Sequence, residues 1–209
     1  MSPVHAVAAL VGEVRADHRF LVELRVRYDD REEFRPGAHP VGRLRGATRL
    51  LSDLVSNIGF QQLAFFRLAS MLGRVGATPL AMVASRLLRH LYGAEMHWQA
   101  QIAPGIALVH GNGLVVSREA RVESGCVLFQ NVTLGISSDP TGATNGGAPH
   151  LHENVHIGPG AVVLGPVEIG PNSKVAGGTT VLQSVPPGMA VTAGPNVVSP
   201  RRGAPATPR

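Results

Sequence analysis

Cysteine, aromatic residues and charge are all scarce in this 209-residue chain, and each shortage excludes a class of protein. The single cysteine, Cys126, excludes an intramolecular disulfide framework and a cysteine-based zinc site. Aromatic residues make up only 4% of the chain, so small aliphatic side chains must build the core. With 16% charged and 44% hydrophobic residues, the composition is that of a folded domain rather than of a disordered polyelectrolyte.

Long apolar runs are also missing. No uninterrupted apolar segment approaches the roughly 18–20 residues that a membrane span requires. The N-terminus lacks the cationic start and apolar block of a secretory signal. We therefore expect a soluble, cytoplasmic protein with no membrane partner.

The excess of basic residues, which gives a net charge of +5, is unevenly distributed. Residues 1–92 contain 13 arginines and 8 acidic residues, whereas residues 93–198 contain three cations and six acidic residues. A nucleic-acid groove interleaves cations with aromatic side chains along one face. Phe129 is the only aromatic residue after Trp98, so we expect no nucleic-acid partner.

The first 92 residues have the apolar spacing of α-helices. A clear apolar stripe occupies residues 60–72, and a looser one occupies residues 4–24. Residues 29–48 are charged and contain proline and glycine, which predicts a loop. We interpret residues 1–92 as an α-helical N-terminal region.

A further helix is predicted from its end signals. Thr78 and Pro79 are typical of an N-cap and a first helical residue. Gly93 is typical of the residue that ends a helix. These signals predict a helix that runs to about Tyr92.

After Gly93 the apolar residues recur every six positions. This period fits neither a helix nor an ordinary strand, but it is typical of a hexapeptide parallel β-helix, in which each short strand supplies one inward aliphatic side chain. The spacing shifts by two residues after Leu114 and shifts again after Leu134. The predicted anchors are Met96, Ile102, Leu108, Leu114, Val122, Leu128, Leu134, Leu151, Ile157, Val163, Ile169, Val175 and Val181.

The second shift falls in residues 135–150, which are polar and contain glycine and proline. We interpret this segment as a loop extruded from the β-helix, and such loops commonly serve binding. The predicted fold is therefore mainly β: a parallel β-helix over residues 93–198, preceded by the helical region. Residues 199–209 read as a flexible tail.

Several short motifs follow one another in a specific order. They are Gly59-Phe60, Gly93-Ala94-Glu95-Met96-His97, His110-Gly111-Asn112-Gly113, Gln130-Asn131-Val132-Thr133-Leu134-Gly135, Val163-Leu164-Gly165-Pro166-Val167 and Val185-Pro186-Pro187-Gly188. Over about 140 residues, their order and spacing resemble the bacterial serine O-acetyltransferases of the hexapeptide-repeat acyltransferase superfamily. Residues 1–58 correspond more weakly to the variable helical region of that family.

The resemblance implies a left-handed β-helix, a homotrimer or a dimer of trimers with active sites between subunits, and a role in cysteine biosynthesis. It implies acetyl-CoA as co-substrate and no metal. His110 falls on the family's general base, Glu95 on the acidic residue that orients this base, and His97 on another family histidine. The residues that fall on the coils facing CoA are Gly158, Ala176, Gly177 and Gly178, and the candidate phosphate partners are Lys174, Arg201 and Arg202.

Elementary chemistry supports these roles. Transfer of an acetyl group from a thioester to a hydroxyl needs a base with a pKa near 7 within reach of the hydroxyl proton, and histidine meets this need. A carboxylate on the other ring nitrogen fixes the tautomer and stabilises the imidazolium. Backbone N–H groups can bind the tetrahedral oxyanion. Direct transfer requires no acyl-enzyme.

The positions at which this sequence departs from the family all concern the acceptor. Val109 replaces the aspartate that precedes the general base, and Gly147-Ala148-Pro149 replaces an Arg-His-Pro segment. Ser117-Arg118-Glu119-Ala120 replaces Gly-Glu-Thr-Ala, which introduces a cation. We expect His97, His150 and Arg118 to contact the acceptor, with serine as the first guess.

Two other features of the sequence are candidate reactive sites. His150, His152 and His156 flank two of the anchors, and we expect surface or substrate-loop histidines rather than a metal site. This expectation assumes that alternate residues of a strand face different sides, which would keep the histidines apart. Cys126 lies inside a hexad and is expected to be a small packed residue rather than a nucleophile.

Three functional hypotheses remain open. The first is an acetyl-CoA-dependent serine O-acetyltransferase. The second is an O-acyltransferase for another hydroxylated acceptor, such as a modified amino acid, a biosynthetic intermediate or a sugar. The third is a catalytically silent trimeric scaffold, against which the presence of His110, Glu95 and the small CoA-facing residues argues.

Overall fold

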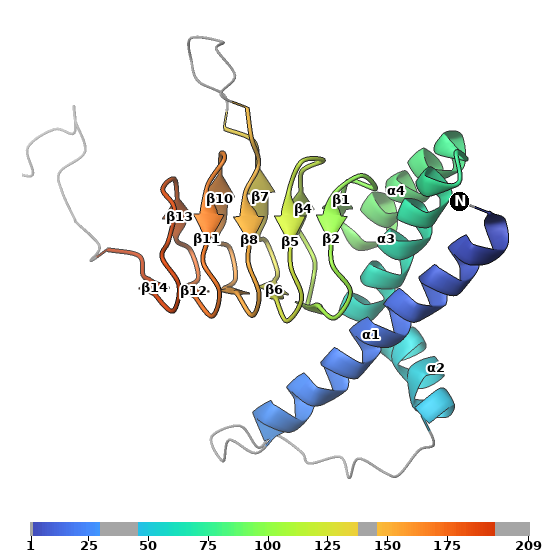
Figure 1. Cartoon of the computed structure of the whole chain (residues 1–209). Helices are drawn as coiled ribbons and strands as arrows, with labels where there is room; N and C mark the ends of the chain where they lie inside the picture. Colours follow the sequence, from blue (N-terminus) through green and yellow to red (C-terminus); the bar gives the residue numbers. More distant parts are fainter. Residues whose placement is uncertain (1, 30–45, 138–145, 195–209) are drawn as a thin grey trace, which may run out of the picture.

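A computed structural model describes residues 2–29, 46–137 and 146–194. It places a group of helices at one end of a stack of short strands (Figure 1). The helices are α1 (Pro3–Asp29), α2 (Gly46–Ser56), α3 (Ile58–Arg74) and α4 (Thr78–Tyr92). None of the described helices combines the length and the apolar character needed to cross a bilayer.

Fourteen strands of two or three residues follow the helices within the described residues. They are β1 (Glu95–Met96), β2 (Gln101–Ile102), β3 (Ala107–Val109), β4 (Val115–Val116), β5 (Arg121–Val122), β6 (Val127–Phe129), β7 (Thr133–Gly135), β8 (His150–Leu151), β9 (His156–Ile157), β10 (Val162–Leu164), β11 (Glu168–Ile169), β12 (Lys174–Val175), β13 (Thr180–Val181) and β14 (Ala190–Val191). Every pairing between them is parallel.

The strands form three sheets that are the faces of a triangular β-helix. Sheet A has the order β1-β4-β7-β10-β13, sheet B the order β2-β5-β8-β11, and sheet C the order β3-β6-β9-β12-β14. Each of the first four coils therefore gives one strand to each sheet, and the chain turns a corner between sheets. In the fifth coil, sheet B is continued only by an isolated bridge between Ile169 and Val185. The predicted β-helix with a preceding helical region is confirmed.

All thirteen predicted anchors are buried, with at most 7% of their surface exposed. The position of the first shift was predicted wrongly, however. The register pairs Met96 with Val116, so Val116 is the sheet A anchor and Leu114 lies in the preceding corner. The two additional residues therefore belong to the turn of residues 110–114, between β3 and β4, and not to the segment after Leu114.

The helix ends also correct the sequence reading in detail. Gly93 ends α4 in the left-handed conformation, with φ of +61° and its N–H bonded to the carbonyl of Arg89, as predicted. The N-cap of α4 is Ala77 rather than Thr78, and Pro79 lies in its first turn. Helix α2 was not predicted. The predicted loop of residues 29–48 overlaps the last residue of α1 and the first three residues of α2, and residues 30–45 lie outside the described residues.

Other predicted segments fall partly or wholly outside the described residues. The predicted loop of residues 135–150 begins in β7 and ends in β8, and residues 138–145 lie outside the description. The same holds for the predicted tail of residues 199–209, which includes the candidate phosphate partners Arg201 and Arg202.

A buried ion pair joins the helices to the first coils of the β-helix. Asp17 on α1 and Arg67 on α3 approach with 2.9 Å between Oδ2 and Nε. The carboxylate of Asp17 also accepts the backbone N–H groups of Gly105 and Ile106. Helices α1 and α3 are therefore fixed directly against the corner that precedes β3.

Candidate active site

His110 lies in the enlarged turn between β3 and β4. Its side chain is exposed, and its φ of +64° places a non-glycine residue in the left-handed region. That conformation costs on the order of 1–3 kcal/mol and persists where the surrounding structure enforces it, frequently at functional sites. The turn thus holds the candidate base outward in a constrained backbone.

The first turn of α3 supports this constrained backbone. The side chain of Asn57 caps α3 by accepting the N–H of Phe60 at 2.8 Å. Gly59 packs so closely on β3 that an added Cβ would lie 2.0 Å from the carbonyl oxygen of Leu108. The Gly59-Phe60 motif therefore brings α3 directly beneath the turn that carries His110.

Gln62 is a residue of this support that the sequence reasoning missed. It is fully buried, and a Cβ on Gly111 would lie 1.6 Å from its Oε1. Among the described residues, neither amide atom of Gln62 has a hydrogen-bond partner. A glutamine placed between Phe60 and Leu63, in the apolar stripe of the helix, was the signal that could have revealed it.

The predicted CoA-facing residues lie on the same edge of the β-helix as His110. This C–A edge consists of the turns from sheet C to sheet A, at residues 110–114, 130–132, 158–161 and 176–179. Neighbouring coils are about 4.8 Å apart, so the first and last of these turns are separated by about 14 Å along the edge. A long, thin co-substrate could therefore extend from the base across several coils.

On this edge, close packing between coils requires glycine at position 158, and the backbone conformation favours glycine at position 178. A Cβ on Gly158 would lie 2.6 Å from the backbone nitrogen of Gly177, so a larger side chain would force the coils apart. Gly178 has φ of +68°, and its N–H bonds to the carbonyl of Pro159. Lys174 is exposed on the outer face of sheet C, two residues before this turn.

Glu95 takes a different partner from the predicted one. Within the described residues, its carboxylate forms an ion pair with Arg89, at 3.5 Å between Oε2 and Nη1, and none with His110. Both Glu95 and Arg89 are more than half exposed. The structure therefore places Glu95 beside the end of α4 rather than on the imidazole that it was expected to orient.

His97 follows β1 and lies at the turn from sheet A to sheet B. Its ring stacks on Trp98, and its Nδ1 accepts the N–H of Gln99 at 3.2 Å. Burial lowers the pKa of His97, the positive charge of Arg118 lowers it further, and the negative charge of Glu95 opposes both effects. His97 is therefore held toward its neutral form, within electrostatic reach of both charges.

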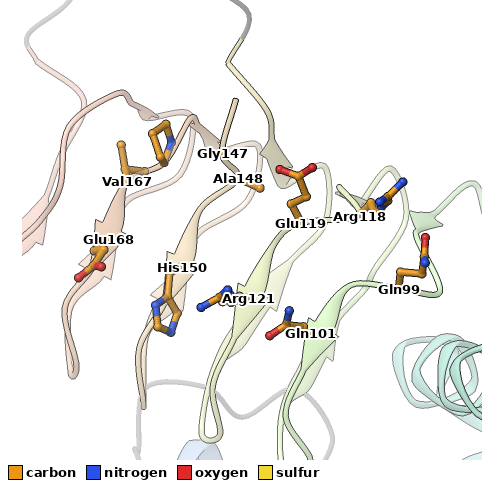
Figure 2. Close-up of a pocket in the computed structure, with 11 residues that line it drawn as sticks. Gln99, Gln101, Arg118, Glu119, Arg121, Gly147, Ala148, His150, Val167 and Glu168 are labelled. Atoms are coloured by element: carbon orange, nitrogen blue, oxygen red, sulfur yellow. The ribbon is translucent and has the colours of Figure 1, made fainter. Parts of the chain in front are cut away.

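Arg118 and His150 line one groove on the outer side of sheet B. The groove has a volume of about 570 Å³ and is bordered by Gln99, Gln101, Glu119, Arg121, Gly147, Ala148, Pro166, Val167 and Glu168. Figure 2 shows Arg118 and Glu119 toward one end, and His150 and Glu168 toward the other. Two predicted acceptor residues, Arg118 and His150, thus line the same groove, although toward opposite ends, and the replacements Gly147 and Ala148 line it as well.

His110 does not border this groove. It lies on the C–A edge, whereas the groove covers sheet B and the turn from sheet A to sheet B. In a triangular coil, these are opposite sides. The candidate base and the candidate acceptor groove are therefore separated within a single chain.

The histidines around β8 correct another expectation. Leu151 is buried, so the side chains of His150 and His152 on either side of it share the outer face, and their rings stack with centroids 4.2 Å apart. The prediction that alternate residues separate these two histidines was wrong. His156 lies on sheet C, away from them.

Cys126 is fully buried, and its thiol donates to the carbonyl of His152 at 3.1 Å. Burial raises the pKa of this thiol to about 12. Only the thiolate is nucleophilic, so Cys126 is a packed core residue, as expected from its place in a hexad.

Comparison with known proteins places these features in a family context. Residues 148–183 match the family model described as bacterial transferase hexapeptide (six repeats). The chain is 36% identical over 153 residues to the serine acetyltransferase of Synechococcus elongatus, which covers 73% of this chain and 62% of the relative. It is 36% identical over 130 residues to the serine acetyltransferase of Escherichia coli K12, covering 62% of this chain and 46% of the relative. The chain thus spans less than two thirds of the length of these curated relatives.

Solved structures agree with these sequence matches. Soybean serine acetyltransferase complexed with serine has a TM-score of 0.69 at 26% identity, covering 89% of this chain and 68% of the soybean chain. A serine acetyltransferase in complex with CoA has a TM-score of 0.70 at 24% identity, covering 90% of this chain and 69% of that chain, and shows the shared fold. Together, the comparisons confirm the family resemblance that the sequence motifs predicted.

Proposed function

Because this chain is related to the serine acetyltransferases over 73% of its length, we propose that it transfers an acetyl group from acetyl-CoA to the hydroxyl of a small acceptor, with L-serine the first acceptor to test. The observation that carries the proposal is the C–A edge. It presents an exposed histidine in a constrained turn at one end and glycine-rich coil packing about 14 Å further along.

In the proposed reaction, a ring nitrogen of His110 takes the proton of the acceptor hydroxyl as its oxygen attacks the thioester carbonyl carbon. The tetrahedral oxyanion then collapses, the carbon–sulfur bond breaks, and the imidazolium returns the proton to the departing thiolate. The products are the acetyl ester and free CoA, and no acyl-enzyme forms. The exposure of His110 allows both substrates to reach it.

CoA would lie along the C–A edge, where the close-packed turns of Gly158, Ala176, Gly177 and Gly178 leave the backbone accessible. Lys174 beside this edge would pair with a phosphate group. A serine acetyltransferase of the same fold was solved in complex with CoA, which supports CoA as the co-substrate.

The acceptor groove supplies charges of both signs. Arg118 would pair with the carboxylate of an amino-acid acceptor, and Glu119 beside it with the ammonium group. His97 and His150 would supply imidazole groups for hydrogen bonding. These side chains would replace the family's acceptor-binding residues, whose positions read Val109, Gly147 and Ala148 here. Because the replacements are chemically different, another hydroxylated acceptor is the second candidate.

A trimer would complete the site. The base lies on the C–A edge and the groove on the opposite side of the same chain, and a threefold arrangement would set the edge of one subunit beside the groove of the next. Glu95 would orient His110 in such an assembly only if its carboxylate left the ion pair with Arg89 and bound the imidazole of His110. Light scattering on the purified chain tests the trimer: a monomer that turns over acetyl-CoA at full rate would exclude a shared site.

The decisive experiment measures thiol release from acetyl-CoA with L-serine and with a panel of other hydroxylated acceptors. His110→Ala should lower the rate by about 10²–10⁴-fold, which is the usual contribution of a general base. His5→Ala is the matched control, because His5 is an exposed histidine on α1 whose hydrogen bond is with Ser2. Lys174→Gln should raise the KM for acetyl-CoA while leaving kcat unchanged.

The outcomes separate the hypotheses. Turnover with serine that His110→Ala abolishes supports the proposal, and turnover with another acceptor alone moves the substrate but keeps the chemistry. Silence across the panel while CoA still binds favours the scaffold hypothesis. Equal rates for wild type and His110→Ala would refute the mechanism.

A further inference from the structure

A second group of chemically capable side chains lies on the outer face of sheet B. The register sets Arg121 on β5 opposite His150 on β8, and Val122 opposite Leu151. The N–H of Glu123 then bonds to the carbonyl of Leu151 at 2.9 Å. This register brings the carboxylate of Glu123 onto the stacked rings of the two histidines that flank Leu151.

The three side chains converge on a small volume. Oε1 of Glu123 lies 2.8 Å from Nε2 of His150 and 3.5 Å from Nδ1 of His152. One ligand atom of each residue lies within 4.8 Å of the other two, and no other set of His, Cys, Asp or Glu in the described residues meets that condition. Two ligands of a tetrahedral ion, each about 2.1 Å from it, are about 3.4 Å apart, so only small side-chain movements are needed.

From this geometry, we propose that Glu123, His150 and His152 bind a divalent transition-metal ion of the zinc type. Two imidazoles and one carboxylate suit Zn²⁺, Ni²⁺ or Cu²⁺, whereas Mg²⁺ and Ca²⁺ prefer sets of oxygen ligands. The site uses neither His110 nor the C–A edge, but it shares His150 with the proposed acceptor groove.

A partner for one of the ligating histidines is already in place. Nε2 of His152 lies 3.4 Å from Oε2 of Glu168 on the neighbouring strand β11. Histidines that bind metals usually donate their other ring N–H to a carboxylate, which fixes the tautomer and orients the ring. With Nε2–H directed to Glu168, the lone pair of Nδ1 is left for the ion beside Glu123.

The site is open to solvent. The side chains of His150 and His152 are 25% and 29% exposed, so an ion can enter and keep a water molecule as its fourth ligand. Arg121 extends toward His150 along the same face (Figure 2). The positive charge of Arg121 repels a bound metal ion, so Arg121 lowers the affinity of the site for metal.

The test is isothermal titration calorimetry. The 209-residue chain is first stripped of metal with a chelator and is then titrated with ZnCl₂. We expect one ion per chain. His152→Ala and Glu123→Gln should each weaken binding by at least tenfold, and Glu168→Gln by about tenfold through the loss of ring orientation. Arg121→Gln should tighten binding, and MgCl₂ should give no binding heat. His5→Ala, an exposed histidine on a distant helix, is the matched control and should bind zinc as the wild type does.

Circular dichroism on each variant confirms that the β-helix is intact, so that lost binding reports on the ligands. Zinc affinity that is unchanged in both His152→Ala and Glu123→Gln would place the ion elsewhere and overturn the proposal. So would a stoichiometry well below one ion per chain in the wild type. A result in which Arg121→Gln weakens binding would show that Arg121 does not act by charge repulsion, and would contradict this arrangement of the site.

Discussion

Removal of the Arg67 guanidinium should destabilise the protein strongly, because it leaves a buried charge without a partner. The guanidinium donates from Nε and Nη2 to the two oxygens of Asp17, at 2.9 and 3.1 Å. It also donates to the backbone carbonyls of Ile102 and Ala103. In Arg67→Met, the carboxylate of Asp17 and both carbonyls would remain in a site that water does not reach.

The magnitude follows from burial. The side chains of Arg67 and Asp17 are only 3% and 1% exposed. Loss of one partner from such a buried pair typically costs about 3–5 kcal/mol of unfolding free energy. For a chain of this size, each kcal/mol lowers Tm by about 2–4 °C, so Tm should fall by roughly 6–20 °C.

The same two helices provide a matched control. Arg74 on α3 and Glu13 on α1 form an ion pair of similar two-point geometry, at 2.8 and 3.1 Å, but the Arg74 side chain is 43% exposed. Arg74→Met should therefore cost only about 0–1 kcal/mol. The assay is urea unfolding followed by circular dichroism, at one fixed protein concentration because assembly would contribute to stability.

The comparison of the two variants decides the reasoning. If Arg67→Met and Arg74→Met lower the free energy of unfolding by the same amount, burial does not determine how much these ion pairs contribute to stability, and the reasoning fails. A double variant, Asp17→Leu with Arg67→Met, gives a second test. It should recover part of the loss, because it leaves no unpaired charge in the buried site.

Two further predictions rest on shifted pKa values. Burial raises the pKa of the Cys126 thiol to about 12, so the native protein should resist iodoacetamide at pH 8 and react only in urea; rapid native labelling would contradict this. Burial first and Arg118 second lower the pKa of His97, so Arg118→Gln should raise it toward 6.5 and Glu95→Gln should lower it further, as NMR titration can show. Because the pKa of His97 is lower in the folded protein than in the unfolded chain, its protonation favours unfolding as pH falls through 6.5. Arg118→Gln should reduce the stability that is lost in this way.

The repeat was predictable because a period of six is set by burial alone. Each anchor must point into a column of aliphatic side chains, and apolar spacing is visible in one sequence without any partner. The end of α4 at Gly93 was predictable for a similar reason, since the left-handed φ of +61° that it adopts is one that glycine accepts easily.

The location of the two-residue insertion was not predictable from burial. Leu114 and Val116 are both apolar and both at most 1% exposed, so spacing alone permits either as the anchor. Only the pairing of Met96 with Val116 shows that the turn containing His110 is the enlarged one. The distinction matters for function, because the additional residues lengthen the turn that carries the candidate base.

Contacts between elements were likewise invisible in the sequence. Glu95 lies six residues after Arg89, but the two charges meet only because the chain reverses at Gly93, so that the first strand returns beside the end of α4. The pairing of His150 and His152 with Glu123 depends on the register of β5 and β8, which are separated by residues 123–149. A single sequence fixes neither the reversal angle nor that register.

The proposed base and the proposed metal cluster can be separated experimentally because the β-helix keeps its faces apart. His110 belongs to the C–A edge, and the cluster of Glu123, His150 and His152 belongs to sheet B, on the opposite side of the coil. A variant at His152 should therefore remove zinc binding without altering the turn that holds His110. A loss of thiol release in His152→Ala would show that the acceptor groove, which shares His150 with the cluster, borders the active site of a neighbouring subunit. The same variant therefore reports on metal binding in one assay and on subunit contact in the other.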